Sequence, residues 1–137
     1  MTDTVTSQDI SGSFVATIGL QVTAASGDEV TATLPVTAAL LQPYGLLHGG
    51  VLCAVVETIG SVAGALWFGD RGTVVGVHNS THFLRSATVG EVLHAVARPV
   101  HRGSSQQLWR VEVFDAQQRL VATGELRVAN LAPRPAG

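Results

Sequence analysis

At residues 42–68 the chain reads QPYGLLHGGVLCAVVETIGSVAGALWF. The second part of this stretch is apolar and carries a single charged residue, Glu57. We predict a helix that begins at His48 or Gly49 and ends near Phe68, and apolar side chains on nearly all of its sides indicate that it is buried. An ionised carboxylate in such a setting costs several kcal/mol unless it has a partner or a reactive role. Glu57 is therefore the first candidate for chemistry.

Segments with the alternation typical of β-strands flank the predicted helix. Two of them precede it and are joined by a turn at Ser26-Gly27-Asp28, and four follow it with short turns, which favour antiparallel pairing. We therefore predict an α+β fold, with an antiparallel sheet of about six strands wrapped around one long buried helix. A single domain over residues 1–137 is expected, with loose tails at 1–12 and 132–137. The predicted strands are 18–24, 30–36, 73–84, 91–101, 106–115 and 120–129.

The composition indicates assembly with further copies of the chain. Hydrophobic residues make up 46% of the 137 residues and charged residues only 13%. A single copy with so few charges has too little polar surface to cover itself. Open edges of the predicted sheet are most simply covered by pairing with a second copy. We therefore expect a homo-oligomer.

The charge pattern and the chain start exclude several classes of protein. A net charge of −2 and the lack of a Lys/Arg cluster argue against nucleic acid as a partner. The single cysteine, Cys53, excludes a disulfide framework or cysteine-based metal site within one chain. Residues 1–12 have no signal-peptide pattern, so we expect a cytoplasmic protein. Residues 51–68 are long enough to span a membrane, but Glu57 and small polar residues interrupt them without basic flanks, so no membrane partner is expected.

The predicted helix start has the properties of an anion or oxyanion site. Gly49 and Gly50 expose backbone N–H groups at the positive end of the helix dipole. Glu57 and Ser61 are four residues apart and share one helix face, where small neighbours leave room for a ligand or for a second subunit. The residues alone leave both occupants open. They also leave open that Glu57 is merely hydrogen-bonded to a neighbouring strand.

The segments QPYGLLHGG at 42–50 and ETIGSVAG at 57–64 resemble the hotdog-fold acyl-CoA thioesterases. The similarity extends through Arg85-Ser86-Ala87, Gly90 and residues 109–120. It is closest to the subgroup that contains a glutamate-type 4-hydroxybenzoyl-CoA thioesterase and the 1,4-dihydroxy-2-naphthoyl-CoA thioesterase. The resemblance implies an acyl-CoA thioester hydrolase.

The resemblance also implies a role for each residue of the predicted catalytic site. Glu57 would attack the thioester carbonyl or activate water, and the Gly49 N–H would polarise that carbonyl, in agreement with the dipole argument. Gln42 and His48 would position the thioester or the water, and Ser61 would assist. In the family, Glu57 of one chain would face Gln42 and Gly49 of the other. A homodimer, and a dimer of such dimers, is therefore expected.

A second group of residues is implied to contact the substrate. The naphthoyl-type enzymes carry a histidine where Phe83 stands, so the resemblance does not fix the acyl preference. The CoA ester is itself the substrate and no cofactor is expected. His78 and His82 are about 13 Å apart on a strand, too far to share one metal ion. The implied substrate and CoA contacts are Gly50, His82, Phe83, Arg85, Gly103, Ser104 and Ser105, with Arg102 as a further cation nearby.

Three functions remain open from the sequence. Hydrolysis of acyl-CoA thioesters, with aryl or polar acyl groups preferred to long fatty chains, agrees with most of the features above. A non-catalytic acyl-CoA binding protein on the same fold is the first alternative. A hydratase or dehydratase is the second, and it requires a His–Asp or His–Glu arrangement in a different sequence frame.

Overall fold

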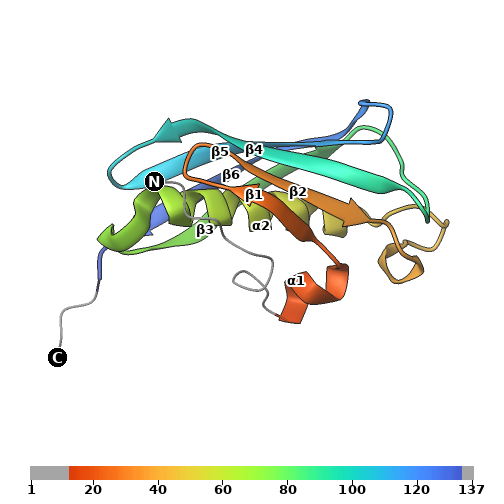
Figure 1. Cartoon of the computed structure of the whole chain (residues 1–137), viewed down its shortest axis with the longest axis horizontal. Coiled ribbons are helices and arrows are strands. Elements are labelled where there is room, and N and C mark those ends of the chain that lie inside the picture. Colours follow the sequence, from red (N-terminus) through yellow and green to blue (C-terminus); the bar gives the residue numbers. More distant parts are fainter. Residues whose placement is uncertain (1–12, 134–137) are drawn as a thin grey trace.

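The computed structural model describes residues 13–133. The predicted tail at 1–12 and residues 134–137 of the predicted tail at 132–137 lie outside the described residues. The predicted order of two strands, one long helix and four strands is confirmed (Figure 1). In chain order the elements are α1 (Ser13–Ile18), β1 (Gln21–Ala25), β2 (Val30–Pro35), the 3₁₀ turn η1 (Ala38–Leu40), α2 (Gly49–Phe68), the 3₁₀ turn η2 (Gly69–Arg71), β3 (Thr73–Phe83), β4 (Val92–Arg102), β5 (Gln106–Phe114) and β6 (Leu120–Leu131).

Helix α1 was not expected from the sequence, which placed the start of the first strand at Ile18. The N–H of Gly19 donates to the carbonyls of Val15 and Ala16, and Gly19 has a φ of 79°, so it ends the helix in the left-handed conformation that glycine adopts readily. Ile18 is buried as the last helical residue. The first strand therefore begins only at Gln21.

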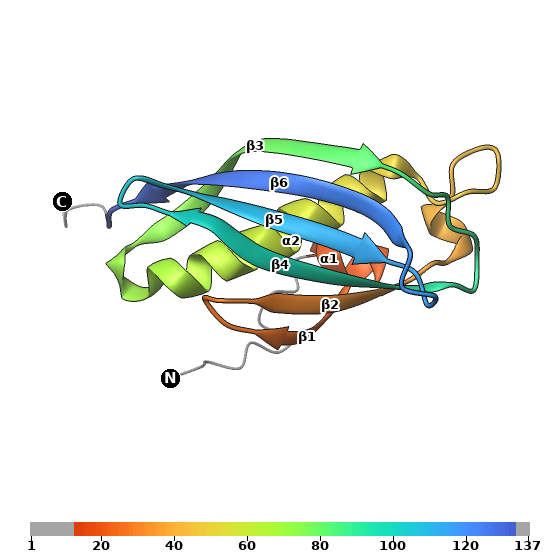
Figure 2. The same cartoon turned by 90° about the horizontal axis from the view of Figure 1, so that it is seen from above.

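The six strands form one antiparallel sheet in the order β1-β2-β4-β5-β6-β3. Helix α2 runs along one face of this sheet, and the views in Figures 1 and 2 show the strands curving over it. The chain enters α2 from β2, near one edge, and leaves it into β3, which forms the opposite edge. Strand β3 pairs only with β6, so its other side is an open edge among the described residues.

The core lies between α2 and the inner face of the sheet. Val55, Val56 and Ile59 of the helix are completely buried. On β5, Trp109 and Val111 are equally buried, and burial alternates along this strand as the sequence pattern of a β-strand predicts.

The prediction of one long buried helix is confirmed for the side of α2 that faces the sheet. The sheet covers one side of α2, whereas Glu57 on the other side is exposed and Cys53 and Ser61 are only half-buried. By length and composition the segment Gly49–Arg71 could cross a membrane, but half of its apolar window is buried inside the fold. Its apolar composition is therefore explained in part by the sheet, and one side is left without a cover.

The turn between β5 and β6 is built on a buried carboxylate. Asp115 accepts the N–H groups of Gln117 and Arg119, both at 2.9 Å, and the Nε–H of Arg119 at 2.8 Å. Burial alone would raise the pKa of Asp115, but these hydrogen bonds and the positive charge of Arg119 outweigh it and hold the pKa below its usual value. The turn therefore keeps an ionised, fully partnered acid at neutral pH.

Replacement of Ile59 by alanine tests the central role of the helix–sheet interface. Ile59 is completely buried, so Ile59→Ala should lower the free energy of unfolding by about 2–5 kcal/mol through lost burial and a residual cavity. Ala65→Ser on the exposed side of the same helix is the control and should change stability by less than about 0.5 kcal/mol. Urea unfolding measures both. Equal stabilities of the two variants would contradict the assignment of the core.

Candidate active site

The start of α2 is prepared by a tight connection from η1. The N–H of Gln42 donates to the carbonyl of Leu46 at 2.8 Å, and Gly45 in the intervening turn has a φ of 83°. His48 is the N-cap of the helix, and its Nδ1 accepts the N–H of Gly50 at 2.8 Å. Because Nδ1 is an acceptor, the neutral ring carries its proton on Nε2. The cap therefore fixes both the ring and its tautomer.

Gly49 and Gly50 differ in what their N–H groups offer. The Gly50 N–H is occupied by His48. Gly49 is the first helical residue, so its N–H has no acceptor within the helix. No hydrogen bond between described residues uses the Gly49 N–H, so it remains a donor for an oxyanion at the positive end of the helix dipole, whereas the prediction that Gly50 also exposes its N–H is wrong.

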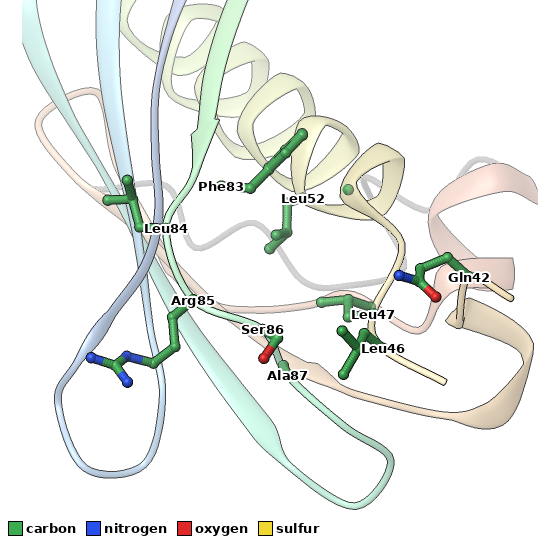
Figure 3. A pocket seen from close by; sticks show the side chains of 10 residues that line it. Gln42, Leu46, Leu47, Leu52, Phe83, Leu84, Arg85, Ser86 and Ala87 are labelled. Atoms are coloured by element: carbon green, nitrogen blue, oxygen red, sulfur yellow. The ribbon is translucent and has the colours of Figure 1, made fainter. Parts of the chain in front are cut away.

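A cleft of about 340 Å³ opens at this helix start (Figure 3). Gln42 turns its side-chain amide toward it, and its Oε1 accepts the N–H of Tyr44, which leaves the amide NH₂ group for a ligand. The Arg85 guanidinium extends away from Gln42 and Leu52 toward solvent. The residues that line the cleft are Gln42, Leu46, Leu47, Gly49, Leu52, Phe83, Leu84, Arg85, Ser86 and Ala87.

Phe83 lies directly against the helix start. A Cβ placed on Gly49 would lie 2.7 Å from Cε2 of Phe83, so the contact depends on the absence of a side chain at position 49. The ring of Phe83 is nevertheless 54% exposed and is available to a ligand in the cleft. Four residues predicted for the site, Gln42, Gly49, Phe83 and Arg85, are thus brought together in one chain.

Glu57 belongs to a different place on the same helix. Its side chain is exposed, and its Oε1 accepts a hydrogen bond from Asn79 Nδ2 on β3 at 3.3 Å. The expectation of an acid surrounded by apolar groups is therefore wrong for the single chain, while the hydrogen bond to a neighbouring strand is confirmed. Ser61 follows one turn later and is half-buried. Sequence reasoning did not identify Asn79, although it is a polar residue on a strand that packs against α2.

Distance separates the two parts of the predicted site within one chain. Glu57 follows Gly49 by eight residues along the helix, which corresponds to about 12 Å at 1.5 Å per residue. A carboxylate that attacks a carbonyl and a donor that polarises the same carbonyl both have to lie about 3 Å from it. Gly49 and Glu57 of one chain therefore cannot act on the same thioester.

The predicted CoA-binding turn lies at the far end of the sheet. Figure 2 shows the β4–β5 turn at the opposite end of α2 from the helix start. Arg102 beside it is engaged by Asp28 at 2.8 Å and by the carbonyl of Gly27 at 2.8 Å. This ion pair holds two turns of the fold together, which gives Arg102 a structural contact in the single chain.

Asn130 donates hydrogen bonds to the backbone carbonyls of all three residues of the turn at 103–105. Its Nδ2 donates to Gly103 O at 3.0 Å and to Ser104 O at 3.2 Å, and its backbone N–H donates to Ser105 O at 2.9 Å. No hydrogen bond between described residues uses the N–H groups of Ser104 and Ser105, and both residues are exposed. The hydrogen bonds of Asn130 therefore use the carbonyls of this turn and leave these two N–H groups without a partner among the described residues.

His82 lies on the outer face of the sheet. It lines a hollow with His78 and Ser80, together with Arg110 and Glu125, whose ion pair measures 3.6 Å. Within one chain His82 therefore does not face Glu57, and a substrate contact for it stays a prediction. Among residues 13–133, no group of three or more His, Cys, Asp or Glu side chains is arranged to hold a metal ion.

Comparisons of sequence and of structure with known proteins identify the family to which the chain is similar. A family model described as the thioesterase superfamily matches residues 44–122. The chain is 46% identical over 125 residues to the Mycobacterium tuberculosis (strain H37Rv) protein Rv1847, with 89% of each chain covered. It is 38% identical over 120 residues to the 1,4-dihydroxy-2-naphthoyl-CoA hydrolase of Escherichia coli K12, with 88% of each covered. The crystal structure of AziG from S. sahachiroi matches with a TM-score of 0.87 and 53% identity, covering 89% of this chain and 98% of that one.

Substitution of His48 separates helix capping from any role in chemistry. His48→Ala removes the acceptor for the Gly50 N–H and should lower the free energy of unfolding by about 0.5–2 kcal/mol. His48→Asn restores a capping oxygen and should recover most of this loss. Thermal and urea unfolding of the two variants measure the difference. An alanine variant as stable as the wild type would show that the cap contributes nothing.

Proposed function

Because the chain belongs to the thioesterase superfamily, we propose that it hydrolyses acyl-CoA thioesters to a free acid and CoA with Glu57 as the catalytic carboxylate. One observation carries this proposal: α2 presents a free donor, the Gly49 N–H, at its start and an exposed carboxylate, Glu57, further along. A carbonyl-polarising donor and a carboxylate that acts as nucleophile or base are together sufficient to hydrolyse a thioester.

Two routes use these groups with the same outcome. Glu57 can add to the thioester carbonyl carbon and displace the CoA thiolate, and water then cleaves the resulting anhydride and restores the carboxylate. Alternatively, Glu57 removes a proton from water as the water attacks. In both routes negative charge develops on the carbonyl oxygen, where the Gly49 N–H donates to it. Gln42 and His48 position the thioester or the water, and Ser61 assists from one turn beyond Glu57.

The complete site requires two chains. The open edge of β3 leaves backbone N–H and C=O groups without strand partners among the described residues, and pairing it with a second β3 would satisfy them. A two-fold axis at this edge reverses the direction of the second α2. Glu57 of one chain is then brought toward Gly49 of the other. We propose a homodimer as the catalytic unit and a pair of such dimers as the full assembly.

The same reversal supports a place for the CoA moiety. In one chain the turn at 103–105 lies far from the cleft, but a two-fold axis would bring this end of one chain toward the helix start of the other. The exposed residues Ser104 and Ser105, with N–H groups that no hydrogen bond between described residues uses, and the cation Arg85 suit a phosphate. The CoA nucleotide is proposed to bind there.

The cleft supports an aryl or polar acyl group rather than a long fatty chain. Its apolar lining consists of Leu46, Leu47, Leu52 and the exposed ring of Phe83, on which a flat group can stack. The Escherichia coli relative is named for a naphthoyl substrate, which is such a group. Gly50 does not line this cleft and its N–H is occupied by His48, so a substrate contact for Gly50 stays a prediction.

Removal of the carboxylate tests the proposed chemistry. Glu57→Gln keeps the shape of the side chain and should lower kcat for a panel of aryl-CoA and fatty acyl-CoA esters by about 10²- to 10⁴-fold. Release of free CoA thiol is the measurement. Glu125→Gln on the outer face of the sheet is the matched control and should hydrolyse the panel like the wild type. Full activity in Glu57→Gln would refute the mechanism, and a wild type that binds the esters without releasing thiol would be a binding protein instead.

Mixed assemblies test whether each site uses two chains. Glu57→Gln and Gly49→Val should each be inactive, the second because a side chain at position 49 overlaps the ring of Phe83. Two differently tagged chains are co-expressed and the mixed species is purified. One of its two sites then has both native halves, so about half of the wild-type activity should return. A mixed species as inactive as its parents would place each site within one chain.

A further inference from the structure

Strand β3 carries a polar pair that faces the helix at Glu57. Asn79 Nδ2 donates to the backbone carbonyl of Cys53 at 3.0 Å and to Oε1 of Glu57 at 3.3 Å. Thr81 Oγ1 donates to Asn79 Oδ1 at 2.7 Å. The chain of contacts therefore runs from Thr81 through Asn79 to the carboxylate.

The chemistry of these groups allows only one orientation of the amide. A carbonyl and an ionised carboxylate accept hydrogen bonds and cannot donate, so the NH₂ end of Asn79 has to face Cys53 and Glu57. Its oxygen then faces Thr81, whose hydroxyl supplies the matching proton. Thr81 thus holds Asn79 with its donors toward the acid.

A β-bulge and two glycines make room for this arrangement. The pairing of β3 with β6 shifts register between Gly76 and His78, which breaks the simple alternation of the strand. Gly76 and Asn79, three residues apart, both face Glu57 as a result. A Cβ on Gly76 would overlap Oε2 of Glu57, and a Cβ on Gly124 would lie 2.8 Å from Oγ1 of Thr81. Strand β3 therefore contacts both carboxylate oxygens of Glu57, Oε1 through Asn79 and Oε2 at Gly76.

We infer that Asn79 is a positioning residue for Glu57, oriented in turn by Thr81, and that β3 thereby sets the direction in which the carboxylate attacks. This inference rests on the proposed function of Glu57. An exposed glutamate has several rotamers, and ordering it costs side-chain entropy. A donor bound to Oε1 restricts these rotamers before the substrate arrives, which is the condition for efficient attack.

Isosteric variants on β3 test the inference. Asn79→Asp replaces the donor by a second carboxylate and should lower kcat about 10- to 100-fold with a much smaller change in KM. Two carboxylates in contact share a proton, so the acid limb of its kcat–pH profile should also move to higher pH. Thr81→Val removes the orienting hydroxyl and should lower kcat as well, whereas Thr81→Ser keeps it and should remain within about twofold of the wild type.

Ser80→Ala provides the matched control, since Ser80 lies between the two residues but points to the outer face. Thermal unfolding and light scattering establish that each variant keeps its fold and assembly. Glu57→Gln is measured in parallel. If Glu57→Gln is inactive while Thr81→Val and Asn79→Asp retain the kcat and pH profile of the wild type, the positioning role is refuted and the proposed function stands. Should Asn79→Asp fail to fold, the comparison of Thr81→Val with Thr81→Ser decides.

Discussion

The close approach of α2 to the sheet is the contact on which the other features depend. Gly60 packs against Leu126 of β6, where an added Cβ would lie 2.8 Å from Cδ2, and Gly64 leaves room for the side chains of Gln107 and Val128. A helix seated this deeply has its open side and its N-terminus fixed relative to β3. The position of Glu57 opposite Asn79 and that of Gly49 under Phe83 both follow from this seating.

The same packing is secured by one buried polar network. Gln107 is completely buried and donates to the carbonyl of Gly64 at 3.2 Å and to Asn130 Oδ1 at 2.8 Å, while its Oε1 accepts the indole N–H of Trp109 at 2.7 Å. Buried polar groups are tolerated when all their partners are present, and they then specify a single arrangement. Because Asn130 also holds the carbonyls of residues 103–105, the network connects the seat of the helix to the β4–β5 turn.

The sequence predicted the architecture because its signals are local. The glycines before α2 and at Gly69 mark the ends of an apolar run, and the alternation in β5 marks a half-covered strand, so these elements agree with the structure. Helix α1 was missed because six residues give too little periodicity to be distinguished from the start of a strand. The exposure of Glu57 was missed because hydrophobicity along a helix does not reveal that a sheet covers only one side of it.

The candidate site was predictable in its residue types and not in its arrangement. The glycines at the helix start predicted an anion or oxyanion site, and the cleft that opens there was not foreseen. Asn79 was not identified because a β-bulge changes which residues of β3 face inward, and a bulge has no reliable signature in a single sequence. The separation of Gly49 from Glu57 follows from helix geometry, but its meaning depends on the second chain.

The same few residues of β3 form the open edge of the sheet and contact Glu57. If this edge joins two chains, the surface by which copies recognise each other is also the surface that aligns the acid. A monomer would then have the carbonyl-binding donor and the carboxylate too far apart to act on one thioester. It would hydrolyse thioesters only after it dimerised. Association with a different but related chain would then lower turnover as well as affinity. Substitutions on β3 would therefore change the choice of partner and the rate of the reaction together.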